Sequence, residues 1–436
     1  MSHNPLKKNM LAEVTVTDMN DMGYGVARTD GVVTFVAGGV TGDLLSVRII
    51  KVAADYAVAR IENVLAPSPH RVEPDCPVFK RCGGCSFRNV TREYELELKR
   101  GFVTSAFRKQ RLDVTVNPVV TDGRADGYRN KVQYPVAPDG TYGYYAPHSH
   151  DIIPCDACAL GDPAFVPITR FVGDFIRKNK IKVKHIYLRR AGMTGETMLC
   201  LVVAEPKIPN EKEFVSAVTA EFPEIKSIVL NINPEDTNVI LGHKTKVIYG
   251  TDLIEDVLCG CRFGISSLSF YQVNRGVAEL LYNEAIRLAY GSKPKNVADL
   301  YCGAGTIGLS FAKAHPEISV RGVEIVPEAI ENARRNAMLN GIGNAEFVCA
   351  DAVTADLTGI DCVLIDPPRK GMSRELTDRL CGSGIRNIVY VSCEPTTLAR
   401  DAAILTEAGY RISDVTPFDM FPRTTAVETV VKFSKE

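Results

Sequence analysis

The stretch Asp299-Leu-Tyr-Cys-Gly-Ala-Gly-Thr-Ile-Gly308 decides the fold class of this 436-residue chain. It follows an apolar run at 297–300, which predicts a strand, and it opens an amphipathic run at 306–314, which predicts a helix. Its glycines are spaced G-x-G-x-x-G, and glycine lets the backbone approach a ligand where a Cβ atom would collide. This order of strand, turn and helix predicts a nucleotide-binding loop in an α/β sheet.

The alternation of strands and helices continues on the C-terminal side of this loop. Further strands are predicted at 320–324, 346–350, 362–365 and 386–392, and further helices at 327–340 and 396–408. This pattern predicts a parallel, doubly wound sheet within residues 261–436. Ligands of such sheets bind beyond the carboxyl ends of the strands. The residues that follow each strand are therefore candidates for the functional site.

Three carboxylates near these strand ends suggest which nucleotide binds. Glu324 ends the strand after the loop, 21 residues beyond Gly303, where a carboxylate can accept both ribose hydroxyls. The loop alone suits a dinucleotide equally well. Asp299 favours S-adenosylmethionine over NAD because it can face a cationic methionine group. Asp351 can accept the adenine amino group, although a single Asp here can equally cap the following helix.

Two motifs follow the strands at 362–365 and 386–392. They are Asp366-Pro-Pro-Arg369 and Cys393-Glu-Pro395. A cysteine thiolate is strongly nucleophilic near neutral pH, so a thiol at a strand end is a candidate nucleophile. The start of the next helix is expected to lower the pKa of Cys393. The alternative is that Cys393 is a small buried hydrophobic residue.

The C-terminal block resembles the RNA uracil-5-methyltransferases. The matching segments are Phe270-Tyr-Gln-Val-Asn274, 299–308, Glu324, 366–369, Val391-Ser-Cys-Glu-Pro395, and Met420-Phe-Pro-Arg-Thr424 with Glu428. The resemblance implies a Rossmann-like class I methyltransferase domain. It also implies the ligands of S-adenosyl-L-methionine, which would be Gln272, Tyr301, Thr306, Glu324, Asp351 and Asp366.

The resemblance further implies a covalent mechanism. Cys393 would add to C6 of uracil, which makes C5 nucleophilic enough to take the methyl group, and Glu428 would then remove the C5 proton. The target base must leave its stack to reach such a pocket. One position departs from the family pattern, since Ala426 stands where histidine is usual. That departure weakens any role for a histidine there and leaves Glu428 in register.

The chain contains 13 cysteines, an odd number. It has no apolar signal segment and no 18-residue apolar run, so we expect a cytoplasmic protein with reduced thiols and no membrane association. Cys76, Cys82 and Cys85 lie close together in the sequence, and Cys155 and Cys158 follow about 70 residues later. Four thiolates can hold an iron–sulfur cluster or a zinc ion, and the spacing does not separate the two.

The family resemblance extends to this cysteine group. The methyltransferase subfamily with an N-terminal TRAM domain carries a [4Fe–4S] cluster, which implies that Cys76, Cys82, Cys85 and Cys158 are its ligands. The role of Cys155 stays open. We expect the cluster to be structural, because the methyl transfer requires no electrons.

Two N-terminal blocks precede the predicted methyltransferase domain. Residues 1–75 alternate short apolar runs with Gly and Asp-Gly turns, which predicts a small β-barrel, and the block resembles an OB-like TRAM domain. Residues 76–260 are predicted to form a mixed α+β domain with the cluster and an RNA-binding surface. Residues 76–131 carry twelve Lys and Arg against six Asp and Glu, although the whole chain has a net charge of −1.

The basic segment also contains Phe79, Phe87 and Tyr128. A basic segment with aromatic residues can track phosphates and stack on bases, although the same aromatics can instead lie in the core. We therefore expect a monomeric enzyme that methylates C5 of a uridine in RNA, 23S ribosomal RNA being favoured. The alternatives are a uridine in transfer RNA, cytosine C5 in RNA, and an iron–sulfur RNA-binding protein without catalysis.

Overall fold

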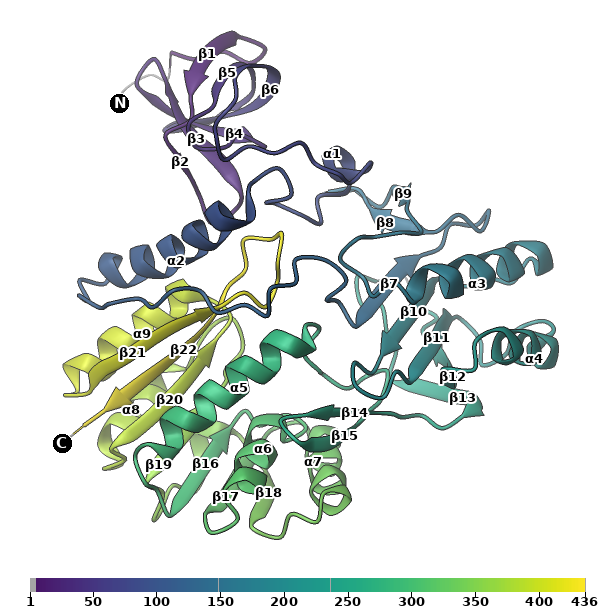
Figure 1. The fold of residues 1–436 in the computed structure, drawn as a ribbon, viewed down its shortest axis with the longest axis vertical. Helices are drawn as coiled ribbons and strands as arrows, with labels where there is room; N and C mark the ends of the chain where they lie inside the picture. The colour runs from purple at the N-terminus through teal and green to yellow at the C-terminus, as the bar shows by residue number, and fades with distance from the viewer. Residues whose placement is uncertain (1–4, 148, 236, 436) are drawn as a thin grey trace.

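The computed structural model describes residues 5–147, 149–235 and 237–435, and Figure 1 shows their arrangement. The N-terminal part is a six-stranded sheet in the order β1-β5-β6-β4-β3-β2. Its strands are β1 (Leu11–Thr15), β2 (Asp18–Met19), β3 (Tyr24–Thr29), β4 (Val32–Ala37), β5 (Leu44–Val52) and β6 (Tyr56–Ala66). The sheet coils into a half-barrel around a core that includes Val36, Val47 and Ile49. This confirms the predicted β architecture.

The central part contains a five-stranded sheet in the order β13-β12-β11-β10-β7. Its strands are β7 (Lys131–Pro135), β10 (His185–Arg190), β11 (Thr197–Val203), β12 (Ile225–Ile232) and β13 (Lys244–Gly250). Helices α3 (Phe165–Asn179) and α4 (Glu211–Glu221) pack on one face through an apolar core. The short helix α1 (Phe79–Cys82) lies near the two-stranded β8 (Gly143–Tyr145) and β9 (Ile152–Pro154) (Figure 1).

The C-terminal part is a seven-stranded sheet in the order β18-β17-β16-β19-β20-β22-β21. Its strands are β16 (Asn296–Leu300), β17 (Ser319–Glu324), β18 (Ala345–Cys349), β19 (Cys362–Ile365), β20 (Asn387–Ser392), β21 (Arg411–Phe418) and β22 (Glu428–Ser434). Its helices are α5 (Arg275–Tyr290), α6 (Thr306–Ala314), α7 (Pro327–Leu339), α8 (Arg374–Gly382) and α9 (Pro395–Glu407). The predicted Rossmann-like domain is confirmed, and the five strands that the pattern placed here lie within two residues of their expected bounds.

The last strand of this sheet runs against its neighbours. β22 pairs antiparallel with both β20 and β21, whereas β16 to β20 are parallel. An antiparallel strand begins at the edge where the parallel strands end. The first residue of β22, Glu428, is thereby delivered to the carboxyl edge of the sheet.

Two elements outside the C-terminal sheet share its core. Helix α2 (Arg92–Lys109) buries Val103 and Phe107 among side chains of the C-terminal domain. The hairpin of β14 (Ile254–Leu258) and β15 (Cys261–Ile265) buries Phe263 in the other core of that domain. By packing, therefore, α2 and β14 belong with the methyltransferase sheet, although they fall within 76–260.

The structure favours the core alternative for Phe87 and Tyr128 over stacking on RNA bases. Phe87 is fully buried in an apolar cluster with Val40 and Val90, and Tyr128 is 3% exposed, with its hydroxyl donating to the carbonyl of Pro422. Two cations of the same segment, Arg88 and Lys99, are also buried and ion-paired. Among the described residues, no helix has the length and apolar character needed to cross a membrane.

Candidate active site

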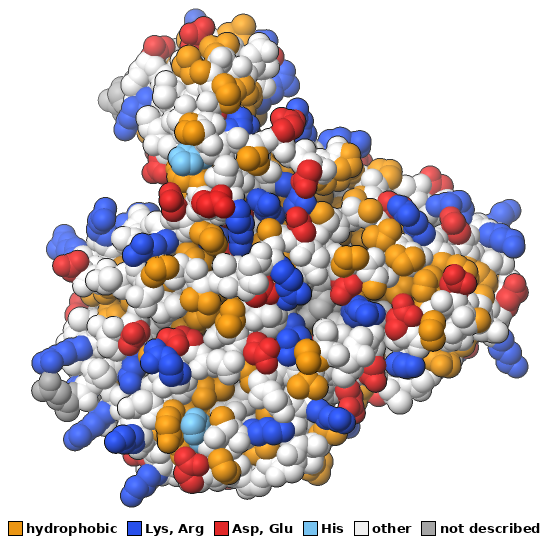
Figure 2. All heavy atoms as spheres, in the orientation of Figure 1, with side chains coloured by type: hydrophobic (Ala, Val, Ile, Leu, Met, Phe, Trp, Pro, Cys, Tyr) orange, Lys and Arg blue, Asp and Glu red, His pale blue; other side chains and the backbone are white. Residues whose placement is uncertain are grey.

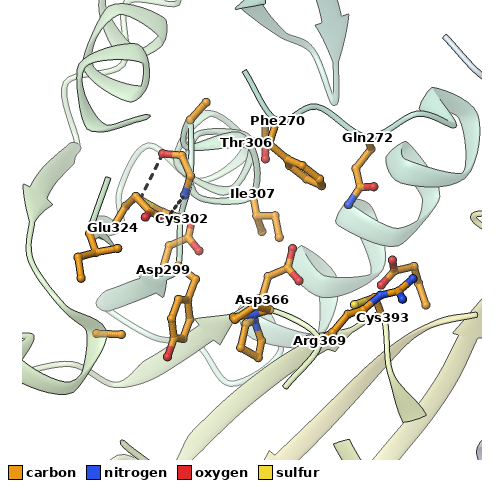
Figure 3. Close-up of a pocket in the computed structure, with 18 of the residues that line it drawn as sticks. Phe270, Gln272, Asp299, Cys302, Thr306, Ile307, Glu324, Asp366, Arg369 and Cys393 are labelled. Atoms are coloured by element: carbon orange, nitrogen blue, oxygen red, sulfur yellow. Dashed lines mark hydrogen bonds between the residues drawn. The ribbon is translucent and has the colours of Figure 1, made fainter. Parts of the chain in front are cut away.

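A cavity of about 830 Å³ lies at the carboxyl edge of the C-terminal sheet. All eight residues predicted to bind cofactor or to catalyse line this cavity: Gln272, Tyr301, Thr306, Glu324, Asp351, Asp366, Cys393 and Glu428. Figure 3 shows Glu324 on one side and Cys393 with Arg369 on the other, with Asp366 between them. The cavity thus joins a cofactor-binding end to a thiol-bearing end.

The glycine loop forms one wall of the cavity. Tyr301 has a φ of 61°, in the left-handed region that non-glycine residues rarely adopt, which is typical of strained turns at binding sites. Gly308 must lack a Cβ atom, since one would lie 2.6 Å from Oδ2 of Asp299. The Gly308 amide donates to that oxygen at 2.9 Å, which fixes the start of α6 against β16.

The carboxylate of Glu324 supports the loop from the next strand. Its oxygens accept hydrogen bonds from the amides of Gly303 (3.3 Å) and Val326 (3.0 Å). Asp351 accepts from the Val353 amide at 2.9 Å and caps a short 3₁₀ helix, Ala352–Thr354. Asp351 therefore serves as the helix cap that the sequence left open, while it also lines the cavity.

Two aspartates, the buried Asp299 and the partly buried Asp366, line the middle of the cavity. Asp299 is 1% exposed, and burial, together with the charges of Asp366 and Glu324, raises its pKa to about 7. Burial raises the pKa of Asp366 to about 7 as well. Two carboxyl groups in this state favour a cation nearby, because a positive charge stabilises their ionised forms.

Cys393 and Glu428 meet at the other end of the cavity. Burial, and then the charges of Glu428 and Asp366, raise the pKa of Cys393 to about 11, and Arg369 acts in the opposite direction. The expectation of a lowered pKa is therefore wrong, because burial and two carboxylates raise it. Burial and Asp366 raise the pKa of Glu428 to about 8.

Three further residues of the cavity were not among the predicted site residues. Arg369 lies near both Cys393 and Glu428 and favours the charged form of each. The Tyr282 hydroxyl lies 3.3 Å from Oγ1 of Thr306. Lys131 enters from β7 of the central sheet, and burial beside Arg189 and Arg129 lowers its pKa to about 8. Of these three residues, Arg369 alone stands in a motif that the sequence singled out, Asp366-Pro-Pro-Arg369.

The five clustered cysteines gather from two segments. Cys76, Cys82, Cys85, Cys155 and Cys158 are free and partly buried. Burial raises the pKa of Cys85 to about 12, and the thiols of Cys158, Cys76 and Cys82 add to that rise. Among the described residues, however, no three His, Cys, Asp or Glu side chains form a group able to hold a metal ion.

Comparisons with known proteins agree with this site. The family model described as tRNA (Uracil-5-)-methyltransferase matches residues 224–436, and the TRAM domain model matches 9–61. An uncharacterized RNA methyltransferase of Halalkalibacterium halodurans is 38% identical over 98% of this chain and 97% of its own length. Another, from Listeria innocua, is 39% identical over 99% of both chains.

A solved structure is similar over almost the whole chain. It is the tRNA (uracil-54, C5)-methyltransferase of Pyrococcus abyssi in complex with S-adenosyl-L-homocysteine, with a TM-score of 0.80 and 27% identity. The match covers 97% of this chain and 100% of the archaeal one. These relatives span the whole chain, and the cavity carries the thiol and carboxylates that the chemistry needs. The chain therefore belongs to the RNA (uracil-5-)-methyltransferase family.

Proposed function

We propose that this enzyme transfers a methyl group from S-adenosyl-L-methionine to C5 of a uridine in ribosomal RNA. The observation that carries the proposal is the shared cavity, which Cys393 and Glu428 line together with the glycine loop. In Figure 3, Asp366 lies between Cys393 and Glu324. S-adenosyl-L-methionine supplies an electrophilic methyl group. Glu324, Asp351, Tyr301, Thr306 and Gln272 would hold it against the loop.

The protein's part of the reaction divides one difficult step into easier ones. The Cys393 thiolate adds to C6 of the base, which places negative charge on the ring and makes C5 nucleophilic. Arg369 stabilises the thiolate before it adds. After C5 has taken the methyl group, the Glu428 carboxylate removes the C5 proton, and the bond from C6 to sulfur breaks. The raised pKa of Glu428, about 8, suits a group that must hold this proton.

The covalent step has a direct test. Wild-type protein should form a stable adduct with RNA that contains 5-fluorouridine, because fluorine at C5 cannot be removed as a proton. Cys393→Ala should bind S-adenosyl-L-homocysteine with unchanged affinity and should form no adduct. Denaturing gel electrophoresis measures the adduct. Covalent trapping by the Cys393→Ala protein would contradict the assignment of the nucleophile.

The RNA class needs a separate experiment. The TRAM domain and the cysteine group support ribosomal RNA, whereas the matching family model and the Pyrococcus abyssi enzyme are both named for transfer RNA. Mapping 5-methyluridine in both RNA classes from cells that lack the protein decides between them. Loss from transfer RNA alone would replace ribosomal RNA as substrate, and loss of 5-methylcytidine would change the target base.

We also propose that Cys76, Cys82, Cys85 and Cys158 hold a [4Fe–4S] cluster. The four donors are all thiols, as such a cluster requires, and Arg88 offsets negative charge at Cys85, although the described side chains are not gathered closely enough to form a metal-holding group. The cluster would brace the fold and take no part in methyl transfer. Iron and sulfide analysis of anaerobically purified protein tests this, and stoichiometric zinc without sulfide would contradict it.

A further inference from the structure

The loop at 419–427, which leads into β22, is held from outside through its own backbone. The carbonyl oxygens of four consecutive residues each accept a hydrogen bond from another element. The donors are Asn274 Nδ2 to Met420 (3.2 Å), Lys99 Nζ to Phe421 (3.0 Å), Tyr128 Oη to Pro422 (3.1 Å) and the Ser86 amide to Arg423 (2.9 Å). In Figure 1 this yellow loop rises from the sheet beside the start of α2.

A group of charged side chains lies beneath this loop, and we call it the buried clamp. It consists of Arg92, Glu95 and Lys99 on α2 with Asp419 and Arg423 of the loop. Glu95, Lys99 and Asp419 have no exposed surface. Lys99 forms ion pairs with Asp419 and with Glu95, the latter at 3.2 Å, and Arg92 pairs with the same two carboxylates. The Arg423 amide donates to Oε1 of Glu95 at 2.7 Å.

The clamp fixes the loop more strictly than apolar packing would. Buried charges are costly unless each keeps its partners. A displaced loop would take Asp419 away from Lys99 and Arg92, which would leave two cations of α2 with a single carboxylate, Glu95, in the interior. The same loop supplies Phe421 and Ala426 to the cavity and leads directly to Glu428. The 419–427 loop therefore belongs both to the buried clamp and to the wall of the active-site cavity.

We propose that Lys99 and Asp419 are positioning residues for methyl transfer, which hold the 419–427 loop so that Glu428 and Phe421 keep their places opposite Cys393. This inference rests on the proposed function, because it assigns these residues to that reaction. Ser86, which anchors Arg423, directly follows Cys85. The cysteine segment is thereby tied to the same loop.

The test combines kinetics with a measurement that needs no turnover. Lys99→Met keeps most of the length of the side chain and removes its charge. Hydrogen–deuterium exchange should rise in 419–427, and the single-turnover rate at which methylated RNA is released from Cys393 should fall roughly 10- to 100-fold, since small misplacements of reacting groups have effects of this size. The affinity for S-adenosyl-L-homocysteine should stay within about twofold, because none of its proposed ligands touches the clamp. Lys99→Arg should restore part of the rate.

The controls separate positioning from general damage. Lys109→Met makes the same change at an exposed position on α2 and should alter neither exchange nor rate. Tyr128→Phe removes the hydrogen bond to Pro422 and the one that Arg129 Nε donates to the Tyr128 hydroxyl, but it leaves every ion pair of the buried clamp in place. It should lower the rate several-fold even if Lys99→Met does not fold. A folded Lys99→Met or Tyr128→Phe protein with wild-type exchange and rate would overturn the proposal, as would a parallel loss of cofactor affinity. An inactive wild type would refute the proposed function, whereas exchange would still report on the clamp.

Discussion

At the residue scale, the site combines a thiol and a carboxyl group that both resist ionisation. The pKa of Cys393 is raised to about 11 and that of Glu428 to about 8, in each case chiefly by burial. Its position after a predicted strand identified Cys393 from the sequence, whereas Glu428 came only from the family resemblance, because the strand that it begins was not predicted. The direction of the Cys393 shift could not be predicted, since Asp366 and Glu428 reach the thiol only through the fold.

Glu428→Gln should stop the reaction after methyl transfer. The amide fills the same space but cannot accept the C5 proton, so the bond between Cys393 and C6 cannot break. With RNA that contains ordinary uridine and no 5-fluorouridine, we expect a methylated RNA–protein adduct to accumulate, while turnover falls by at least about 100-fold. Denaturing gels and mass spectrometry of the adduct measure this. Normal release of 5-methyluridine would exclude Glu428 as the base.

The same carboxyl group should make stability depend on pH. Its pKa is near 4.5 when unfolded and about 8 in the folded protein, so the folded state holds the extra proton between these values. The free energy of unfolding should fall as pH rises from 4.5 to 8. Glu428→Gln should remove this fall and raise stability above pH 8 by on the order of 2 to 4 kcal/mol. Urea unfolding of the wild type and of Glu428→Gln at pH 5 and pH 8.5 tests this. An equal difference in unfolding free energy between the two proteins at both pH values would contradict the prediction.

At the scale of elements, two helical glycines should respond oppositely to alanine. In α6, a Cβ atom at Gly308 would lie 2.6 Å from Oδ2 of Asp299, so Gly308→Ala should cost about 1 to 3 kcal/mol and weaken S-adenosyl-L-homocysteine binding. In α2, Gly101 has no atom within 4 Å of such a Cβ, so Gly101→Ala should stabilise by about 0.5 to 1 kcal/mol. Thermal unfolding measures the stability of both variants, and calorimetric titration measures their affinity for S-adenosyl-L-homocysteine. If both alanine variants were more stable than the wild type, helix propensity would outweigh the contact at Gly308.

Helix α2 shows why part of the fold could not be predicted. Two of its buried positions are Glu95 and Lys99, so the apolar period that identifies a helix is interrupted. The strands β21 and β22 were missed for a related reason, because the alternation of strand and helix ends before them. Elements with a regular apolar period, such as β16 and α6, were predicted almost to the residue.

At the scale of the whole molecule, the basic surplus of 76–131 is partly internal. Arg88 pairs with Asp75 and Asp126, and Lys99 lies in the buried clamp. On the face shown in Figure 2, Lys and Arg are mixed with Asp and Glu rather than gathered in one field. Counting charges along the sequence overstated the RNA-facing charge, because counting cannot tell which cations face inward.

The exposed cations of α1 remain candidates for RNA contact. Lys80 and Arg81 lie on the surface beside the cysteine segment. The double change to Ala should weaken RNA binding and lower the slope of log Kd against log salt by roughly one to two. Lys212→Ala, exposed on α4, should leave the slope unchanged. Filter binding between about 50 and 200 mM salt measures this. An unaltered slope in the double variant would place the RNA elsewhere.

The reversed direction of β22 also bears on how the protein is made. β20 and β21 are not neighbours in the sheet, and the strand that joins them is translated after both. While the ribosome is still extending the chain, the half-barrel and the central sheet can already fold, since domains generally fold as units in order of synthesis. The nascent chain thus contains Cys393 and the glycine loop before it contains Glu428. The base reaches the site only when β22 pairs between β20 and β21.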